Sequence, residues 1–339
     1  MKQTLRNIVF ALTAAASFLT GCGNLPETDR SQQLNYHLAT LEEGQQIIST
    51  SDAYTQSMNE FDLVSRLQDQ KMEPTEENYL ELAKRSVMEW TEKEKEELGL
   101  SAARLQAKLD SAGYQLPLPE DITIIKTSMV EEGGAGGYTR GTCIFLEPCD
   151  KLQPSQRKFL DMLLAHELFH VLTRNNAEFR KAMYHEIGFE LLDHDIDFGK
   201  KLFDIRITNP DVNRYDHYSI FEIDGKKTPC TMWFFTAEEY KGGPFYMYGQ
   251  PALVPLDQDF RPVLDRKGDP ILYNPNRVKG FYDLIGKNTH YIINPEEALA
   301  DNFAFALTDF FPEGQPDPEV TERLRKVMKG SWKNKTEKK

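Results

Sequence analysis

Apolar residues recur at helical spacing through the first third of the chain. Between positions 74 and 99, apolar residues such as Leu80 and Ala83 stand three or four positions apart, with charged residues between them. This spacing places them on one face of a helix, so we expect one helix over 74–99. A second, shorter helix is predicted over 101–113, and the whole region 34–112 is therefore expected to be helical.

After position 113 the pattern changes to β-branched and apolar runs. The runs ITIIKTS (122–128) and TCIFLEP (142–148) are typical of strands. The stretch between them, 129–141, is rich in glycine and is expected to be a flexible loop.

Helical periodicity then returns. One helix is expected to open at Pro154 and to carry the apolar run 161–172, a second covers 176–193, and a third covers 294–311. Residues 206–275 combine prolines, glycines and aromatic residues in short runs, which predicts strands and hairpins. The succession of elements predicts an α+β fold that ends in a polar, lysine-rich tail at 326–339.

The first residues are typical of an export signal and not of the fold. Two cations precede a short apolar run at 8–20, which continues into the tetrapeptide LTGC ending at Cys22. LTGC resembles a bacterial lipobox, which implies removal of 1–21 and lipidation of Cys22. The alternative is an ordinary signal peptide with a coincidental cysteine. The resemblance implies an exported chain anchored to a bacterial membrane, periplasmic or at the cell surface, through a tether at 22–33.

Lipidation of Cys22 would leave three further cysteines, Cys143, Cys149 and Cys230. An exported compartment permits a disulfide between any two of them. The sequence does not choose among these pairings and three free thiols.

Composition and charge limit the classes of partner that the chain is expected to bind. The chain is 40% hydrophobic and 27% charged, as in soluble globular proteins. Its formal net charge of −13 disfavours nucleic acid as a partner, because phosphate backbones attract Lys and Arg. After the N-terminus no run approaches the roughly 18 apolar residues of a membrane span, so membrane contact is expected through the lipid only. The sequence does not predict the oligomeric state.

The run 161–172 contains the motif HELFH, with His166, Glu167 and His170 in an otherwise apolar helix. Residues four apart share a helix face, so both imidazoles can bind one cation. Glu167 is turned away by about 100° and can approach a water next to that cation. This is the HExxH arrangement of zinc hydrolases. The alternative is a buried helix with two hydrogen-bonded core histidines.

Catalytic zinc takes three protein ligands, and the predicted helix 294–311 offers the third. Glu297 and Asp301 are four apart and share a face. At this point the chain resembles the gluzincins, zinc metallopeptidases with HExxH on one helix and ExxxD on a later one. The resemblance implies that Glu297 binds one zinc ion and that Asp301 hydrogen-bonds His166. Glu296 is the rival ligand, but the residue four positions after it is alanine.

The resemblance also implies a fold. We expect a zincin-like catalytic domain at 113–325, with a small mixed sheet, an active-site helix and a later ligand helix. Residues 206–275 would be a strand-rich insertion, because the two motifs are far apart. The strand at 142–147 is expected to form the upper rim of the cleft. The loop 133–137 would lie at its end, or else be a solvated hairpin loop.

Zinc hydrolases of this kind also need a side chain that donates a hydrogen bond to the oxyanion, the negatively charged oxygen that forms on the attacked carbonyl. Lethal-factor-like zincins place a tyrosine about two helical turns before the ligand Glu, and His290 and Tyr291 stand near that position here. His217 is a reserve candidate.

With Glu167 as the general base, the expected activity is hydrolysis of a peptide or protein substrate. The alternatives are a catalytically silent zincin-fold lipoprotein that binds a protein or polysaccharide partner, and a hydrolase of non-peptide amides. Substrate and cleavage specificity cannot be derived from the sequence.

Overall fold

The first sheet is built from short strands that are far apart in the sequence. A computed structural model describes residues 32–149 and 153–335. Strands β1 (Tyr36–Leu38), β2 (Ile122–Lys126), β3 (Gly137–Arg140) and β4 (Cys143–Leu146) form a sheet in the order β1-β2-β4-β3. The pairs β1–β2 and β2–β4 are parallel, and β3 pairs antiparallel with β4 at the edge.

Both faces of this sheet are covered by helices, which explains why its two central strands, β2 and β4, are almost continuously apolar. Successive residues of a strand point to opposite faces. Ile122 and Ile124 accordingly pack among residues of α5 (Glu92–Ala112) and α6 (Arg157–Asn175). Ile125 packs on the other side among residues of α1 (Leu41–Ile48) and α4 (Glu76–Ser86).

The predicted helix over 74–99 is wrong at its boundary. The chain breaks at Val87, which adopts an extended conformation and bridges to Thr127. A new helix, α5, starts after Thr91. The side chain of Thr91 accepts a hydrogen bond from the backbone N–H of Glu94 in a capping box. Gly99 lies inside α5, because packing and capping outweigh the modest helix penalty of one glycine. Region 34–112 is otherwise helical apart from β1.

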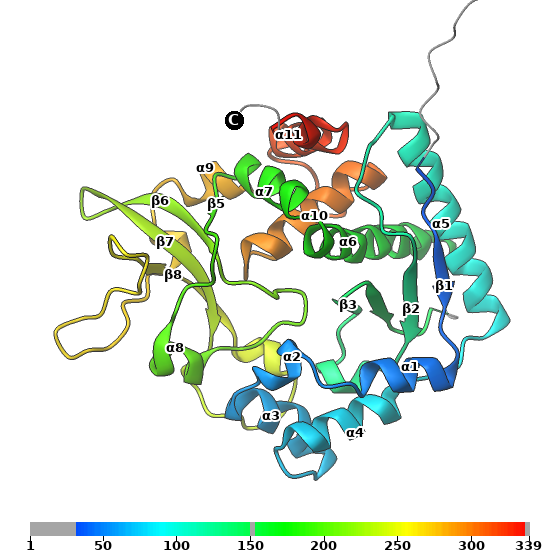
Figure 1. Cartoon of the computed structure of the whole chain (residues 1–339), viewed down its shortest axis with the longest axis horizontal. Coiled ribbons are helices and arrows are strands. Elements are labelled where there is room, and N and C mark those ends of the chain that lie inside the picture. The colour runs from blue at the N-terminus through cyan, green and yellow to red at the C-terminus, as the bar shows by residue number, and fades with distance from the viewer. Residues whose placement is uncertain (1–31, 150–152, 336–339) are drawn as a thin grey trace, which may run out of the picture. The chain divides into compact units, whose positions relative to one another are not determined.

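Helix α6 is central to the fold (Figure 1). It packs against α5 on one side and against α10 (Pro295–Thr308) on another. Asn294 is the N-cap of α10, and its side chain accepts a hydrogen bond from the backbone N–H of Glu296. The helix is buried along nearly its whole length. Many of its buried residues are alanines, which let the backbones of the two helices approach closely.

Two helices flank this pair. The segment 176–193 is helical only as α7 (Ala177–Glu186), after which the chain enters a strand. The expected polar tail is partly wrong, because α11 (Pro318–Met328) and a 3-10 turn at Ser331–Lys335 occupy most of it. Trp332 there donates a hydrogen bond to the carbonyl of Gln115.

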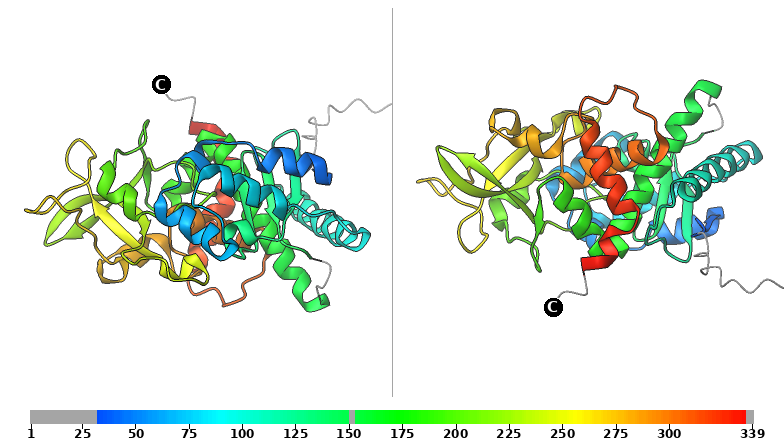
Figure 2. Two further views of the ribbon diagram at one scale, coloured as in Figure 1. Left: turned by 90° about the horizontal axis from the view of Figure 1, so that it is seen from below. Right: turned by 90° about the horizontal axis from the view of Figure 1, so that it is seen from above.

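A second sheet confirms the strands and hairpins predicted over 206–275. Strands β5 (Glu190–Leu191), β6 (His217–Ile223), β7 (Lys226–Phe235) and β8 (Gln250–Pro255) are antiparallel in sequence order. Asp224 and Gly225, both with positive φ, make the tight turn between β6 and β7. The three views show this sheet and the first one on opposite sides of α6 and α10 (Figure 2).

The described residues therefore have an α+β fold, as predicted, and they form one compact unit. The remaining helices are α2 (Ala53–Gln56), α3 (Glu60–Leu67), α8 (Gly199–Ile205) and α9 (Phe281–Ile285). None of the helices in the described ranges is both long enough and apolar enough to span a membrane. The predicted signal peptide and Cys22 lie outside the described residues, as do the start of the tether and the end of the tail.

Cys143 and Cys230 are free thiols. None of the three disulfides that the sequence allowed among Cys143, Cys149 and Cys230 is therefore formed. Burial raises the pKa of the Cys230 thiol to about 12, so this side chain is an apolar core residue at neutral pH.

A buried ion pair joins the N-terminal helices to the glycine-rich segment. The guanidinium of Arg66 on α3 lies 2.9 Å from Oε2 of Glu132, and neither side chain is more than 3% exposed. Tyr54 donates a second hydrogen bond to Glu132 at 2.6 Å. The same guanidinium donates to the carbonyl of Thr208 at 3.3 Å, so it also fixes a loop of the second half.

Substitution Arg66→Ala leaves Glu132 buried without its cation and should lower the free energy of unfolding by about 3–5 kcal/mol. Arg85→Ala is the control, because Arg85 pairs with Glu81 at 2.8 Å on an exposed helix face. It should change the free energy of unfolding by less than about 1 kcal/mol. Urea unfolding measures both, and equal effects of the two substitutions would contradict the structural role given to Arg66.

Candidate metal centre

Helices α6 and α10 bring two imidazoles and one carboxylate together at their contact. His166 and His170 lie one turn apart on α6, and Glu297 faces them from the first turns of α10. Oε2 of Glu297 lies 3.2 Å from Nε2 of His166 and 3.5 Å from Nε2 of His170. The three ligand atoms all lie within 4.8 Å of one another.

This spacing suits a tetrahedral cation. Two ligand atoms that are each about 2.05 Å from an ion at tetrahedral angles stand roughly 3.3 Å apart. The two measured separations, 3.2 and 3.5 Å, bracket that value. The donor set of two imidazoles and one carboxylate is also the set that zinc and similar transition metals accept.

Two buried polar atoms at this point have no hydrogen-bond partner among the described residues. They are Nε2 of His170 and Oε2 of Glu167. Burying a polar atom without a partner costs free energy, so such atoms are rare unless a ligand satisfies them. A cation at the centre of the cluster would satisfy His170, and a water beside that cation would satisfy Glu167.

A second layer of side chains orients the imidazoles. Nδ1 of His166 lies 2.9 Å from Asp301, as the resemblance to the gluzincins implied, and Thr289 donates to the other oxygen of Asp301. Nδ1 of His170 lies 3.4 Å from Glu296. Contacts of this kind select the tautomer that presents Nε2 to a metal.

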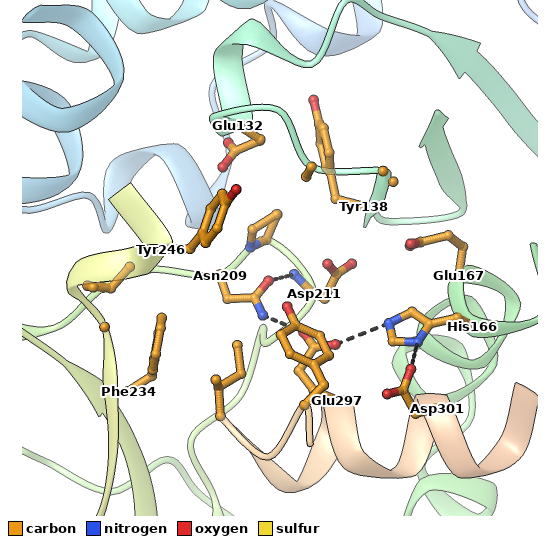
Figure 3. A pocket seen from close by; sticks show the side chains of 18 of the residues that line it. Glu132, Tyr138, His166, Glu167, Asn209, Asp211, Phe234, Tyr246, Glu297 and Asp301 are labelled. Atoms are coloured by element: carbon orange, nitrogen blue, oxygen red, sulfur yellow. Dashed lines mark hydrogen bonds and ion pairs between the residues drawn. The ribbon is translucent and has the colours of Figure 1, made fainter. Parts of the chain in front are cut away.

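Glu296, the rival ligand in the sequence, therefore lies behind His170 and not beside Glu297. It is held there by Thr173, which donates to Oε1, and by Tyr184, which donates to Oε2 at 2.6 Å. These contacts direct its carboxylate away from Nε2 of His170. Figure 3 shows Glu297 and Asp301 both directed toward His166 from α10, with Glu167 beside it on α6.

The cluster has more negative charge than its histidines can neutralise. Burial alone would lower the pKa of His170, but the carboxylates of Asp211 and Glu297 raise it to about 10. Burial and the charge of Asp211 raise the pKa of Glu167 to about 8. Both shifts mark a site in which added positive charge is favourable.

Asp211 and Asn209 belong to the site, although neither was predicted. They lie in the segment 207–211 between α8 and β6, which passes along the cavity. Asn209 donates to Oε1 of Glu297 and accepts from the backbone of Asp211 (Figure 3). No sequence motif marks these two residues, because they reach the metal centre through a loop of the predicted insertion.

Asp211 also forms a second group with Glu167 and His170, whose ligand atoms lie within 4.8 Å. Both groups require Nε2 of His170 if the imidazole keeps its contact with Glu296, so only one ion can be held. We favour the group with Glu297, because both of its imidazoles have an orienting carboxylate behind them.

The three candidates for the oxyanion donor are not equivalent in space. The side chain of His290 is 91% exposed and faces Glu313 at 3.5 Å, so it does not line the cavity. Tyr291 does line the cavity, and its ring centroid lies 6.2 Å from that of His166. His217 on β6 is fully buried between Tyr184 and Phe189 and does not line the cavity, so it has no part in the site.

The strand predicted over 142–147 was expected to form the rim of the cleft, but the neighbouring strand β3 does so. Strand β4 is paired on both sides, whereas β3 is the free edge. The cavity of about 610 Å³ is lined by Gly136, Gly137 and Tyr138 at this edge. A Cβ at Gly137 would lie 2.8 Å from Oε1 of Glu167, so a larger residue there would displace the carboxylate. The sequence assigned this edge to a loop because the run 133–137, which leads into it, consists of glycine and alanine alone.

A comparison with protein-family models, with curated proteins and with solved structures finds no match to this chain.

Substitution Asp301→Asn should weaken Zn²⁺ binding by about ten- to a hundredfold, because the amide orients His166 less strongly than the carboxylate does. Competition with a chromogenic chelator measures the affinity. Asp309→Asn, at the far end of the same helix, is the control and should leave it unchanged. Equal affinities of wild type and Asp301→Asn would contradict the orienting contact.

The burial of His217 predicts how the stability of the fold depends on pH, and it has no bearing on catalysis. Burial, aided by Arg180, lowers its pKa from 6.5 to about 4. The unfolded chain therefore binds this proton first as the pH falls, so the folded state loses stability between pH 6.5 and 4.

Between pH 7 and pH 4.5 the titration of His217 should lower the free energy of unfolding by about 2–3 kcal/mol. His217→Phe should lose correspondingly less stability over that interval in urea unfolding. An identical loss in wild type and variant would show that His217 does not titrate as its burial implies.

Proposed function

We propose that this chain is a zinc-dependent metallopeptidase of gluzincin type, with a zincin-like catalytic domain. The observation that carries the proposal is the spacing of 3.2 and 3.5 Å between Glu297 and the two imidazoles, next to an unpartnered Oε2 of Glu167. A buried pair of hydrogen-bonded core histidines would not leave Nε2 of His170 without a partner.

Zinc bound by His166, His170 and Glu297 would polarise the scissile carbonyl and make an adjacent water more acidic. Glu167 is placed to accept a proton from that water while the oxygen attacks the carbonyl carbon. It then returns the proton to the departing nitrogen as the C–N bond breaks, so one water is consumed for each bond cleaved. Asp301 keeps His166 oriented through this cycle.

Tyr291 supports the same reaction. Of the two neighbouring candidates it is the one that borders the cavity. Although 42% of Tyr291 is exposed, desolvation by the surrounding protein and the charge of Glu297 raise its pKa, so its phenol stays protonated at neutral pH. A protonated phenol can donate a hydrogen bond to the oxyanion that forms at the carbonyl oxygen.

The free edge of β3 supports a peptide as the substrate. Extended peptides bind such edges by adding a strand, which aligns their backbone over the neighbouring catalytic groups. Gly137 of this edge lies directly against Glu167. We further infer, from the tetrapeptide that ends at Cys22, that the enzyme is exported and lipid-anchored.

Glu167→Gln tests the proposal, because the amide cannot accept the proton from water. The variant should bind one Zn²⁺ per chain, as the wild type does, and kcat/KM for peptides should fall by about 10²–10⁴-fold. Metal content is measured by atomic emission and hydrolysis by mass spectrometry of a peptide library. Glu178→Gln, on the first turn of α7, is the matched control. Hydrolysis that survives in Glu167→Gln would reject Glu167 as the base.

A further inference from the structure

The cavity runs along the free edge of β3, and this edge is closed at Thr139. The backbone N–H of Thr139 points away from β4 and donates to Oδ1 of Asp211 at 2.7 Å. Its hydroxyl donates to the same oxygen at 2.8 Å. A substrate strand would need that N–H, so only the end of the edge near Gly137 is open to it.

The segment 207–211 that closes the edge is held in place by buried charges. Arg174 donates to the carbonyl of Pro210 at 3.0 Å and to that of Asp211 at 3.3 Å. On the other side, the backbone N–H of Thr208 donates to Asp62 at 2.9 Å. These contacts make the segment a fixed wall of the cavity and not a lid.

The charge of the cavity distinguishes the two ends of a peptide. Its described lining residues include neither lysine nor arginine, and they include five carboxylates: Glu132, Glu167, Asp211, Glu297 and Asp301. Apart from His166 and a bound zinc ion, a terminal carboxylate would meet no cationic group among these lining residues, whereas a terminal ammonium would be attracted by the carboxylates.

One of these carboxylates has no other assigned role. Glu132 pairs with Arg66, Asp301 orients His166, Glu297 faces both imidazoles and Glu167 is the base. Asp211 is only 8% exposed, and within the described part of the chain its Oδ2 accepts no hydrogen bond. Oδ1 accepts both hydrogen bonds from Thr139, so Oδ2 is the oxygen of Asp211 that remains available to a ligand at the wall of the cavity.

The position of Asp211 limits what fits between it and the reacting carbonyl. Its carboxylate lies within 4.8 Å of ligand atoms of both Glu167 and His170. In an amino acid the α-amino nitrogen lies about 2.5 Å from the carbonyl carbon. A carbonyl placed at the candidate metal centre therefore brings the amino group of the same residue within reach of Asp211.

We propose that the cavity binds the free amino end of a peptide, with Asp211 accepting hydrogen bonds from the ammonium group, and that the enzyme removes residues singly from that end. This inference rests on the proposed peptidase function. The reaction is hydrolysis of the first peptide bond, which consumes one water and releases a free amino acid and a peptide shortened by one residue. Phe234, Phe245 and Tyr246 line the cavity and favour a bulky apolar first residue.

The test compares one peptide sequence that begins with leucine, carrying either a free or an acetylated amino terminus, and a longer peptide blocked at both ends. The full mature chain is loaded with one Zn²⁺, and products are identified by mass spectrometry. We expect leucine to be released from the free peptide, and acetylation to lower kcat/KM by about a hundredfold.

Asp211→Asn keeps an oxygen that can accept from Thr139 but removes the charge. It should reduce the preference for the free amino terminus by about ten- to a hundredfold. Asp283→Asn, an exposed carboxylate on α9, is the matched control and should keep the preference.

Calorimetry with the Glu167→Gln chain separates binding from hydrolysis. The free peptide should bind at least about tenfold more tightly than the acetylated one, and adding Asp211→Asn should remove the difference. Internal cleavage of the doubly blocked peptide, lost in Glu167→Gln, would overturn the inference and leave the peptidase proposal intact. Absence of any hydrolysis, with the Asp211-dependent preference still measured by calorimetry, would reject the peptidase and retain the amine site. Equal binding of both peptides would overturn the amine site.

Discussion

The close contact between α6 and α10 is the constraint on which the site depends. Small residues of α10, among them Ala298 and Ala300, are buried and let the two helices approach. This contact places Glu297 within 3.5 Å of the imidazoles of His166 and His170. It also carries Asp301 and Glu296 to the far nitrogens of the same rings. One helix pair therefore supplies both the candidate ligands and the groups that orient them.

Concentrated negative charge is costly in a buried site, and the fold manages it in two ways. Carboxylates that face the protein interior are paired with cations, as in Arg66–Glu132 and Arg180–Asp216. Asp211 and Glu297, which also face the cavity, have no lysine or arginine partner of this kind, and they raise the pKa of His170. A site of this kind favours cations in two positions, a metal ion between the helices and an ammonium group beside Asp211.

The chemistry of the helix pair could be predicted from the sequence, because it depends on spacing within single helices. The four-residue spacing placed Glu297 and Asp301 on one helix face. The resemblance to the gluzincins implied that Asp301 contacts His166, and the structure has this contact. The predicted boundary at Gly99 failed because capping by Thr91 and the bridge at Val87 act through neighbouring residues and the sheet. Asp211, Asn209 and the edge strand β3 were missed for a related reason. Their roles arise from tertiary contacts of a loop and of a glycine-rich segment, which carry no periodic signal.

The position of a bound metal ion tests the proposed metal centre most directly. Anomalous diffraction from crystals of the zinc-loaded chain, recorded on both sides of the zinc absorption edge, locates the ion without reference to activity. We expect one strong peak about 2.0–2.2 Å from Nε2 of His166, Nε2 of His170 and a carboxylate oxygen of Glu297. A peak coordinated by Glu167 and Asp211, or no peak between α6 and α10, would contradict this expectation.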